Sequence, residues 1–212
     1  TPDDMDFENR LRLINSESET VKPDILCVQE LEEKEEQRFA SIPSLASFDH
    51  VCQPRADHDT IKPKIEGSAV FFSKDRFSLL KKHRLTLKMI KEIYPLSDAF
   101  SKEMIKSCAA SLLILETKED DPLQRKKGSK TRLAVLSTHL PFSVTVGHVK
   151  FASIILIMKV LRELKKVYEF SDFFICGDFN LVPCSMLYDF LVSSSLDLNL
   201  GLKDFSMQKW AL

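Results

Sequence analysis

The composition of this sequence does not assign a function, but what the sequence lacks excludes several classes of protein. Only five of the 212 residues are glycine and one is tryptophan, which excludes collagen-like and low-complexity chains. No uninterrupted apolar stretch approaches the roughly 18 residues that a membrane-spanning helix needs. The start, TPDDMDFENR, lacks the basic and apolar regions of a signal peptide. We therefore expect no membrane association and a cytoplasmic or nuclear location.

The charges and the cysteines exclude further classes. The 30 Lys and Arg residues balance 31 Asp and Glu residues, so no net field attracts a polyanion and any affinity for phosphate must be local. Five cysteines without a CxxC pair indicate neither a zinc site nor a disulfide framework, and they fit a reducing compartment. Cys27 and Cys176 lie within apolar runs and are expected to be packed thiols.

The chain is long enough for one domain with a substantial core. A chain of 212 residues, 44% of them apolar, buries about 70% of the surface that it exposes when unfolded. No repeat, linker or low-complexity tract divides it, so we expect a single domain over residues 1–212.

Hydrophobic periodicity predicts strands interleaved with helices. Helices are expected over 7–21, 149–170 and 186–193, the last with Ser185 as its N-cap, and strands over 24–30, 47–55, 68–73, 77–82, 108–117, 131–140 and 173–176. We expect 68–73 to pair with 77–82 in an antiparallel hairpin and 108–117 to pair with 131–140 in a second one. The pattern is typical of an α+β domain with sheets sandwiched between helices.

The run FFICGDFNLVP, residues 173 to 183, ends a strand expected to be buried with an acid and an amide. In an extended segment the side chains alternate, so Asp178 and Asn180 would face one side and Phe179 the core. Oxygen ligands at the rim of a sheet suit Mg²⁺. Because Asp and Asn are also common turn residues, an ordinary turn is the competing interpretation.

Two further apolar strands end in polar groups. PDILCVQE ends in Gln29 and Glu30, and RLAVLSTHL places His139 where it could protonate a leaving group or bind a phosphate oxygen. A single histidine after a strand is usually structural. Three separate strands that each deliver a group suited to metal and phosphate chemistry indicate one shared site, because chance turns would rarely do this.

The segments PDILCVQE, GSAVFFSKDRF, STHL and CGDFNLVP, in that order, resemble the motifs of the endonuclease/exonuclease/phosphatase superfamily. The surrounding residues are similar to one branch, the Angel proteins, the carbon catabolite repressor deadenylases and nocturnin, at Glu66–Ala69, Pro183, Ser185, Leu187 and Tyr188. The later stretch LNLGLKDFSMQ also resembles an Angel segment. The resemblance covers nearly the whole chain and implies a four-layered α/β sandwich of the DNase I type.

The resemblance also implies a role for each candidate residue. Glu30 is similar to the metal-binding Glu of the family, and Asp178 and Asn180 resemble the pair that orients the attacking water and contacts metal or scissile phosphate. His139 resembles the histidine that stabilises the phosphoryl group. The implied metal set is Glu30 and Asp178, and the implied cofactor is Mg²⁺ or Mn²⁺, with the number of metals left open.

The resemblance implies an RNA substrate for a metal-dependent phosphodiesterase, and the reaction stays open between exonuclease action on poly(A) tails and phosphatase action on 2′,3′-cyclic ends. Other superfamily members act on DNA or lipid. A second hypothesis is a catalytically inactive scaffold that binds RNA or a protein. The family's first, Asn-bearing strand and its final Ser-Asp-His strands have no counterpart in residues 1–212. We therefore expect a domain incomplete at both ends, with weak or absent turnover by this chain alone.

Overall fold

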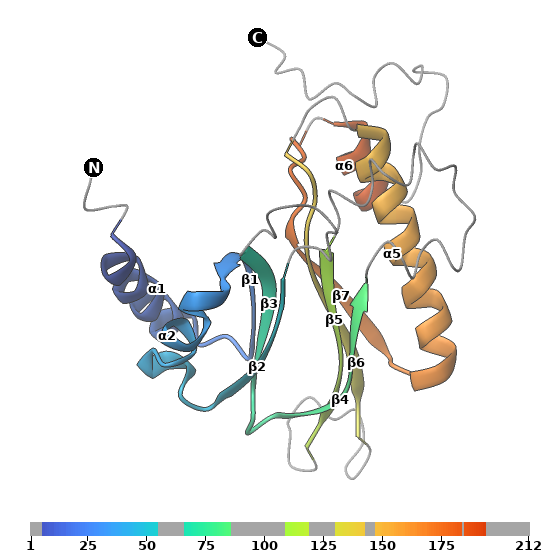
Figure 1. Cartoon of the computed structure of the whole chain (residues 1–212). Helices are drawn as coiled ribbons and strands as arrows, with labels where there is room; N and C mark the ends of the chain where they lie inside the picture. The colour runs from blue at the N-terminus through green and yellow to red at the C-terminus, as the bar shows by residue number, and fades with distance from the viewer. Residues whose placement is uncertain are drawn as a thin grey trace.

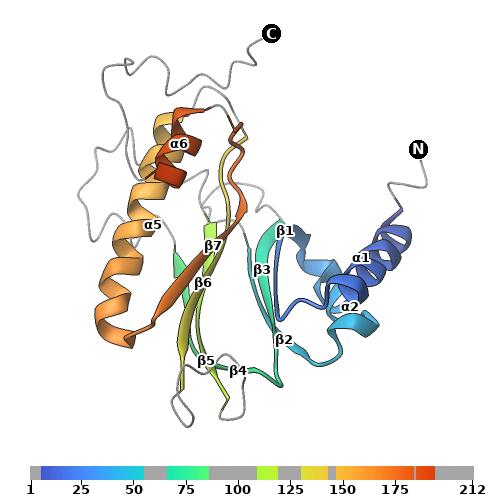
Figure 2. The ribbon, with the colours of Figure 1, turned by 180° about the vertical axis from the view of Figure 1, so that it is seen from behind.

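Two β-sheets face each other at the centre of the computed structural model, and helices cover the outer face of each sheet (Figure 1). One sheet has the strand order β1-β3-β2 and the other the order β4-β5-β6-β7. Helices α1 and α2 lie outside the first sheet, and α5 and α6 lie outside the second; Figure 2 shows the same layers from behind. This arrangement confirms the predicted four-layered α/β sandwich.

The structure describes residues 6–54, 66–85, 109–118, 130–142, 147–183 and 185–193. Within these ranges no helix is long and apolar enough to cross a membrane. The elements are α1 (Phe7–Val21), β1 (Ile25–Glu32), η2 (Glu33–Glu35), α2 (Glu36–Ala40), η3 (Pro43–Leu45), β2 (Phe48–Pro54), β3 (Glu66–Ser73), β4 (Phe77–Leu85), β5 (Ala109–Thr117), β6 (Arg132–His139), α5 (Gly147–Tyr168), β7 (Asp172–Asp178) and α6 (Met186–Ser193).

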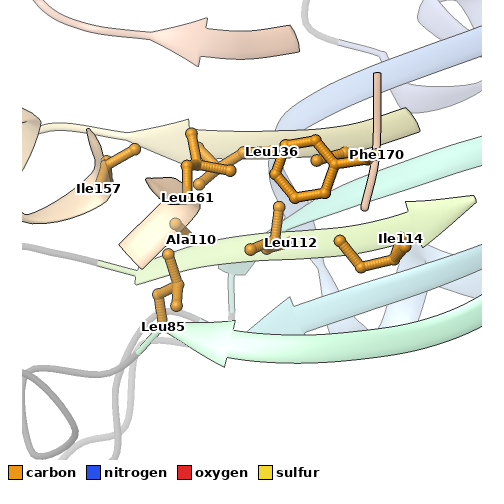
Figure 3. Packing of buried hydrophobic residues seen from close by; sticks show 9 residues of the cluster. Leu85, Ala110, Leu112, Ile114, Leu136, Ile157, Leu161 and Phe170 are labelled. Carbon is orange, nitrogen blue, oxygen red and sulfur yellow. The ribbon is translucent and has the colours of Figure 1, made fainter. Parts of the chain in front are cut away.

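Strand β5 shows why the fold needs helices on one side and a second sheet on the other. Its run of apolar residues is buried on both faces, as is common for a strand covered on both sides. Leu112 and Ile114 pack with Leu161 of α5 and with Phe170 (Figure 3). Leu113 and Leu115 point the other way and pack with side chains of the first sheet.

The first sheet is covered in the same way. On its inner face Val70 and Phe72 of β3 join the core between the sheets. On its outer face Phe71 packs with Leu11 of α1 and Phe39 of α2. Burying such a side chain stabilises the fold by about 2 kcal/mol. Each interface between layers buries several such side chains, and each of them adds to the stability of the fold.

Most predicted elements are confirmed, including the antiparallel pairing of β5 with β6 and the N-cap of α6. Ser185 Oγ accepts a hydrogen bond from the Tyr188 amide at 3.2 Å, which satisfies one of the unpaired amides of the first turn. The segment LNLGLKDFSMQ lies outside the described residues.

The predicted hairpin of 68–73 with 77–82 is wrong. Strand β3 pairs with β1 on one side and with β2 on the other, while β4 pairs with β5 in the second sheet. Both edges of β3 are therefore occupied. The short connection between β3 and β4 carries the chain from one sheet to the other, and a sequence pattern of two strands with a tight turn does not distinguish this from a hairpin.

The expectation that the FFIC strand is buried is wrong in part. Strand β7 pairs with β6 but with no other strand of the described residues. Its aromatic side chains are correspondingly accessible, with Phe173 42% and Phe174 50% exposed. An apolar run thus forms a strand at the edge of the sheet.

Gly177 permits the close approach of β7 to β6. Its φ is 140°, which side chains rarely tolerate, and a Cβ atom built there would lie 1.9 Å from the Thr138 carbonyl oxygen. Thr138 and Gly177 are partners in the register of the two strands. Glycine at this position is therefore a condition for the pairing.

We expect Gly177→Ala to destabilise the protein by about 3 kcal/mol or more, because strained backbone and a steric clash add up. Urea unfolding followed by circular dichroism measures the change. Val192→Ala, at an exposed site on α6, is the control and should change the stability by less than about 0.5 kcal/mol. Equal stability of Gly177→Ala and wild type would contradict this explanation of the pairing.

Candidate active site

Two candidate residues meet where β6 and β7 end. The strands are parallel, and His139 and Asp178, their last residues, are partners in the register. The pairing continues one residue further, because the Leu140 amide donates to the Asp178 carbonyl oxygen at 2.8 Å. His139 Nε2 lies 3.8 Å from Asp178 Oδ2. The geometry of the sheet thus brings an imidazole and a carboxylate together.

Glu30 reaches the same place from the other sheet. The pairing of β1 with β3 is irregular between Val28 and Leu31, and Glu30 within this bulge has a left-handed φ of 59°. Its Oε1 lies 3.9 Å from His139 Nε2. Strained backbone of this kind is common at functional sites, and here it accompanies a carboxylate that reaches the end of β6.

The three side chains differ in exposure. The His139 side chain is 8% exposed, whereas those of Glu30 and Asp178 are 64% and 53% exposed. A buried imidazole is therefore flanked by two carboxylates that remain open to solvent and ligands. The structure brings together the residues that the three strand ends predicted.

Asn180 lies beside this group, but the reason is not the one expected, which was the alternation of side chains along an extended strand. The extended strand ends at Asp178, and Asn180 has a left-handed φ of 50°. Its amide donates to Asp178 Oδ1 at 2.8 Å, and its side-chain Nδ2 donates to the Leu140 carbonyl oxygen at 2.9 Å. The turn interpretation and the site interpretation are thus compatible, because a turn holds the ends of β6 and β7 together.

Lys150 in the first turn of α5 is a residue that the sequence analysis missed. It is 1% exposed, and its Nζ donates to the Asn180 carbonyl oxygen at 2.7 Å. Burial lowers the pKa of its ammonium group, while the negative charge of Asp178 acts in the opposite direction. A signal was available, since Lys150 shares one helical face with Ile154, Ile157 and Leu161.

Polar contacts between the sheets lie beneath the site. Gln29 Nε2 of β1 donates to Ser137 Oγ of β6 at 3.1 Å. Close by, the thiols of Cys27 on β1 and Cys176 on β7 interact with each other across the sandwich. The interaction with Cys176 and burial raise the pKa of Cys27, whereas the interaction with Cys27 lowers the pKa of Cys176 to about 7. The expectation of two packed thiols therefore omits a contact across the sandwich.

The donor set of Glu30 and Asp178 fits a hard divalent cation. Mg²⁺ is usually held by one or two carboxylates and keeps several waters. In the part of the chain that the structure describes, no group of three or more His, Cys, Asp or Glu side chains is arranged to hold a metal ion. Two carboxylates are thus the protein ligands on which a metal proposal rests.

A groove of about 620 Å³ adjoins the site. Asp178 and Asn180 line one end of it, and Phe173, Tyr188 and Leu191 line its apolar part. Another depression, of about 580 Å³, lies between α1 and α2 and contains none of the candidate residues. The groove borders the turn at Asp178 from the helix side, because Phe173 and Ile175 lie on the face of β7 that packs against α5, whereas Cys176 and Asp178 lie on the face toward the first sheet.

Comparison with known proteins identifies the family. No protein-family model matches the chain. Protein angel homolog 2 of Danio rerio is 30% identical over 201 residues, which cover 92% of this chain and 32% of that protein. The CCR4-Not complex 3′-5′-exoribonuclease subunit Ccr4 of Candida albicans is 26% identical over 203 residues, covering 87% of this chain and 24% of that protein. The chain belongs to the endonuclease/exonuclease/phosphatase superfamily, in the branch of the Angel, CCR4 and nocturnin proteins.

Solved structures agree with the fold of the chain. ANGEL2, described as a 2′,3′-cyclic phosphatase in complex with adenosine-2′,3′-vanadate, matches with a TM-score of 0.73 and 24% identity, over 97% of this chain and 54% of that one. The match confirms the DNase I-like fold. The chain spans about a third of the length of the curated Angel and phosphodiesterase relatives that it matches.

The contact between Cys27 and Cys176 gives a test of the geometry beneath the site. Cys27→Ala removes the donor that lowers the pKa of Cys176, so at pH 7 less thiolate forms and alkylation of Cys176 by iodoacetamide should slow by about threefold to tenfold. Cys27→Ser keeps a hydroxyl donor and should retain most of the rate. Mass spectrometry of the labelled peptides measures both.

Cys52 on β2 is the internal control for this experiment. Burial raises its pKa to about 11, so it should react more slowly than Cys176 and equally in all variants. An alkylation rate of Cys176 that is the same in wild type and Cys27→Ala would exclude the contact.

Proposed function

We propose that this protein hydrolyses a phosphoester bond of RNA with the help of Mg²⁺ or Mn²⁺ bound by Glu30 and Asp178. One observation carries the proposal: carboxylates from two different sheets both lie within 4 Å of Nε2 of the buried His139. Like charges are rarely gathered around one imidazole for stability alone, because they repel each other when nothing neutralises them. A divalent cation would balance the two carboxylates and leave His139 free to meet the negative charge of a phosphate.

The chain's own residues have separable roles in such a reaction. Asp178 accepts a hydrogen bond from the attacking water and aligns it with the phosphorus atom. His139, in its protonated form, donates to a phosphoryl oxygen and stabilises the charge that develops there. Water attacks phosphorus and gives up a proton to solvent, the bond from phosphorus to the sugar oxygen breaks, and that oxygen leaves after it takes a proton from solvent. Glu30 and Asp178 would hold the metal ion, which would supply polarisation of the phosphoryl oxygen.

Asn180 acts on the site through the backbone in this proposal. Its amide holds Asp178 Oδ1, and its side chain holds the Leu140 carbonyl oxygen next to His139. The two bonds fix the ends of β6 and β7 relative to each other. Asn180 therefore preserves the spacing between the carboxylate and the imidazole in addition to any contact with phosphate.

RNA is the substrate class that the relatives favour. One relative is named a 3′-5′-exoribonuclease subunit, and the ANGEL2 structure is described as a 2′,3′-cyclic phosphatase.

A terminal 2′,3′-cyclic phosphate is the first candidate among RNA substrates, because the Angel relative is 30% identical and the Ccr4 relative 26%. The second candidate is the 3′ end of an RNA strand such as a poly(A) tail, because the Ccr4 relative is named a 3′-5′-exoribonuclease subunit. The two reactions differ in the leaving group, so the same carboxylates and imidazole would serve either one.

We expect Glu30→Gln and Asp178→Asn each to lower hydrolysis by about a hundredfold or more, because each keeps the shape of the side chain and removes a charged ligand. RNA with a cyclic phosphate end and poly(A) RNA are incubated separately with excess protein and Mg²⁺, and the products are resolved by gel. Wild type should hydrolyse weakly, and EDTA should abolish the reaction.

Glu32→Gln is the matched control, since Glu32 lies on the same strand as Glu30 and pairs with Lys34. It should leave hydrolysis within about twofold of wild type. Calorimetry with Mn²⁺ gives a second readout, in which wild type and Glu32→Gln bind the ion and the two site variants do not. If wild type binds RNA but neither hydrolyses it nor binds Mn²⁺, the result would favour the scaffold hypothesis and contradict the proposal.

A further inference from the structure

Lys150 is buried at a place where a lysine is unusual. Its side chain is 1% exposed in the first turn of α5, on the helical face that also buries Ile154 and Ile157. Lysine is among the residues that are least often fully buried, because its ammonium group loses its hydration. An apolar residue would suit the packing of this face better, so the charge or the hydrogen bond that Lys150 supplies must matter.

The hydrogen bond of Lys150 is directed at the turn after β7. Its Nζ donates to the Asn180 carbonyl oxygen at 2.7 Å, and the negative charge of Asp178 acts on its ammonium group. The turn has two other bonds, from the Asn180 amide to Asp178 and from the Asn180 side chain to Leu140. The first closes the turn on the last residue of β7, and the second joins the turn to the residue after β6. Lys150 joins the turn to the helix layer.

Asn180 needs such support because its backbone is left-handed, with a φ of 50°. Asparagine reaches this conformation at a smaller cost than other residues with a side chain, but it keeps the conformation only where the surroundings determine it. The conformation directs the Asn180 amide to Asp178 Oδ1 and leaves Asp178 Oδ2 facing His139. Whatever holds Asn180 therefore orients the carboxylate as well.

We propose that Lys150 is a positioning residue for the hydrolysis, which fixes the carbonyl of Asn180 and through it the carboxylate of Asp178. The catalytic part of this inference rests on the proposed function, and the structural part does not. Its positive charge, which interacts with the carboxylate of Asp178, also offsets some of the negative charge that gathers when a phosphate enters the site. Lys150 touches neither water nor phosphate in this role.

Two variants separate this role from simple packing. Lys150→Met keeps the length and the apolar stem but removes the donor and the charge, while Lys150→Arg keeps both. Lys165→Met on the same helix is the matched control, because Lys165 is exposed in the last turn of α5. Thermal melting establishes that each variant is folded. If Lys150→Met does not fold, Lys150→Gln, which can still donate but has no charge, replaces it in the comparison with Lys150→Arg.

Amide hydrogen exchange tests the structural part. In Lys150→Met the amides of Asn180 and Leu140 should exchange about tenfold faster, because the turn opens more often. The amides of Leu113 and Val135 in the centre of the sheet should be unchanged, and Lys150→Arg and Lys165→Met should resemble wild type. Unchanged exchange at Asn180, or an equal rise at Leu113 and Val135, would overturn the inference, the latter by showing general destabilisation. If Lys150→Gln is used, the exchange rates of the Asn180 and Leu140 amides decide in the same way whether Lys150 holds the turn.

Hydrolysis of RNA with a cyclic phosphate end tests the catalytic part. We expect kcat of Lys150→Met to fall about tenfold or more while KM changes by less than about threefold, since an oriented carboxylate matters for the transition state. Lys150→Arg should recover most of kcat. A rise in KM with unchanged kcat would contradict a positioning role. If wild type and Glu30→Gln hydrolyse equally or not at all, the proposed function fails, and hydrogen exchange still decides whether Lys150 holds the turn.

Discussion

The parallel pairing of β6 with β7 is the constraint on which the site depends. It sets His139 against Asp178 at the shared end of the two strands, and a slip of one residue would turn the Asp178 side chain to the opposite face of the sheet. Gly177 allows the backbones to approach where any side chain would meet the Thr138 carbonyl. A parallel pair also requires a long crossover, which α5 provides. Because α5 begins near the end of β6, its first turn brings Lys150 to the same place.

The second requirement is that two sheets stay in a fixed relation. Glu30 belongs to the first sheet, so its distance from His139 depends on the packing between Phe72, Leu113 and Val135 and on the bond from Gln29 to Ser137. A protein interior packed at this density transmits small displacements. The carboxylates therefore converge through the core of the sandwich, although the residues that carry them are far apart in the sequence.

The sequence predicts the layers and the candidate residues better than it predicts how they are connected. Apolar runs that end in Glu30, His139 and Asp178 are visible in one dimension, and the strand ends do meet in the structure. The separation of β3 from β4 into two sheets is not visible, because the pairing partners of β3 come from distant segments. The exposure of Phe174 follows from the position of β7 at a sheet edge, which the apolar run conceals.

Sequence patterns do not predict the local backbone conformation of the site either. Alternation along a strand assumes extended backbone, whereas Glu30 and Asn180 are both left-handed. Lys150 carries no motif, and only its place on an apolar helical face separates it from the many surface lysines. The roles of Glu30, Asp178, Asn180 and His139 in catalysis, and of Mg²⁺ as the cofactor, stay predictions.

The most direct test of the shared cation site is anomalous X-ray diffraction from crystals grown with Mn²⁺. The account predicts one anomalous peak between the carboxylates of Glu30 and Asp178, at about 2.0–2.3 Å from an oxygen of each, and loss of the peak in crystals of Asp178→Asn. A peak elsewhere with none between these two residues, or an unchanged peak in the variant, would contradict it.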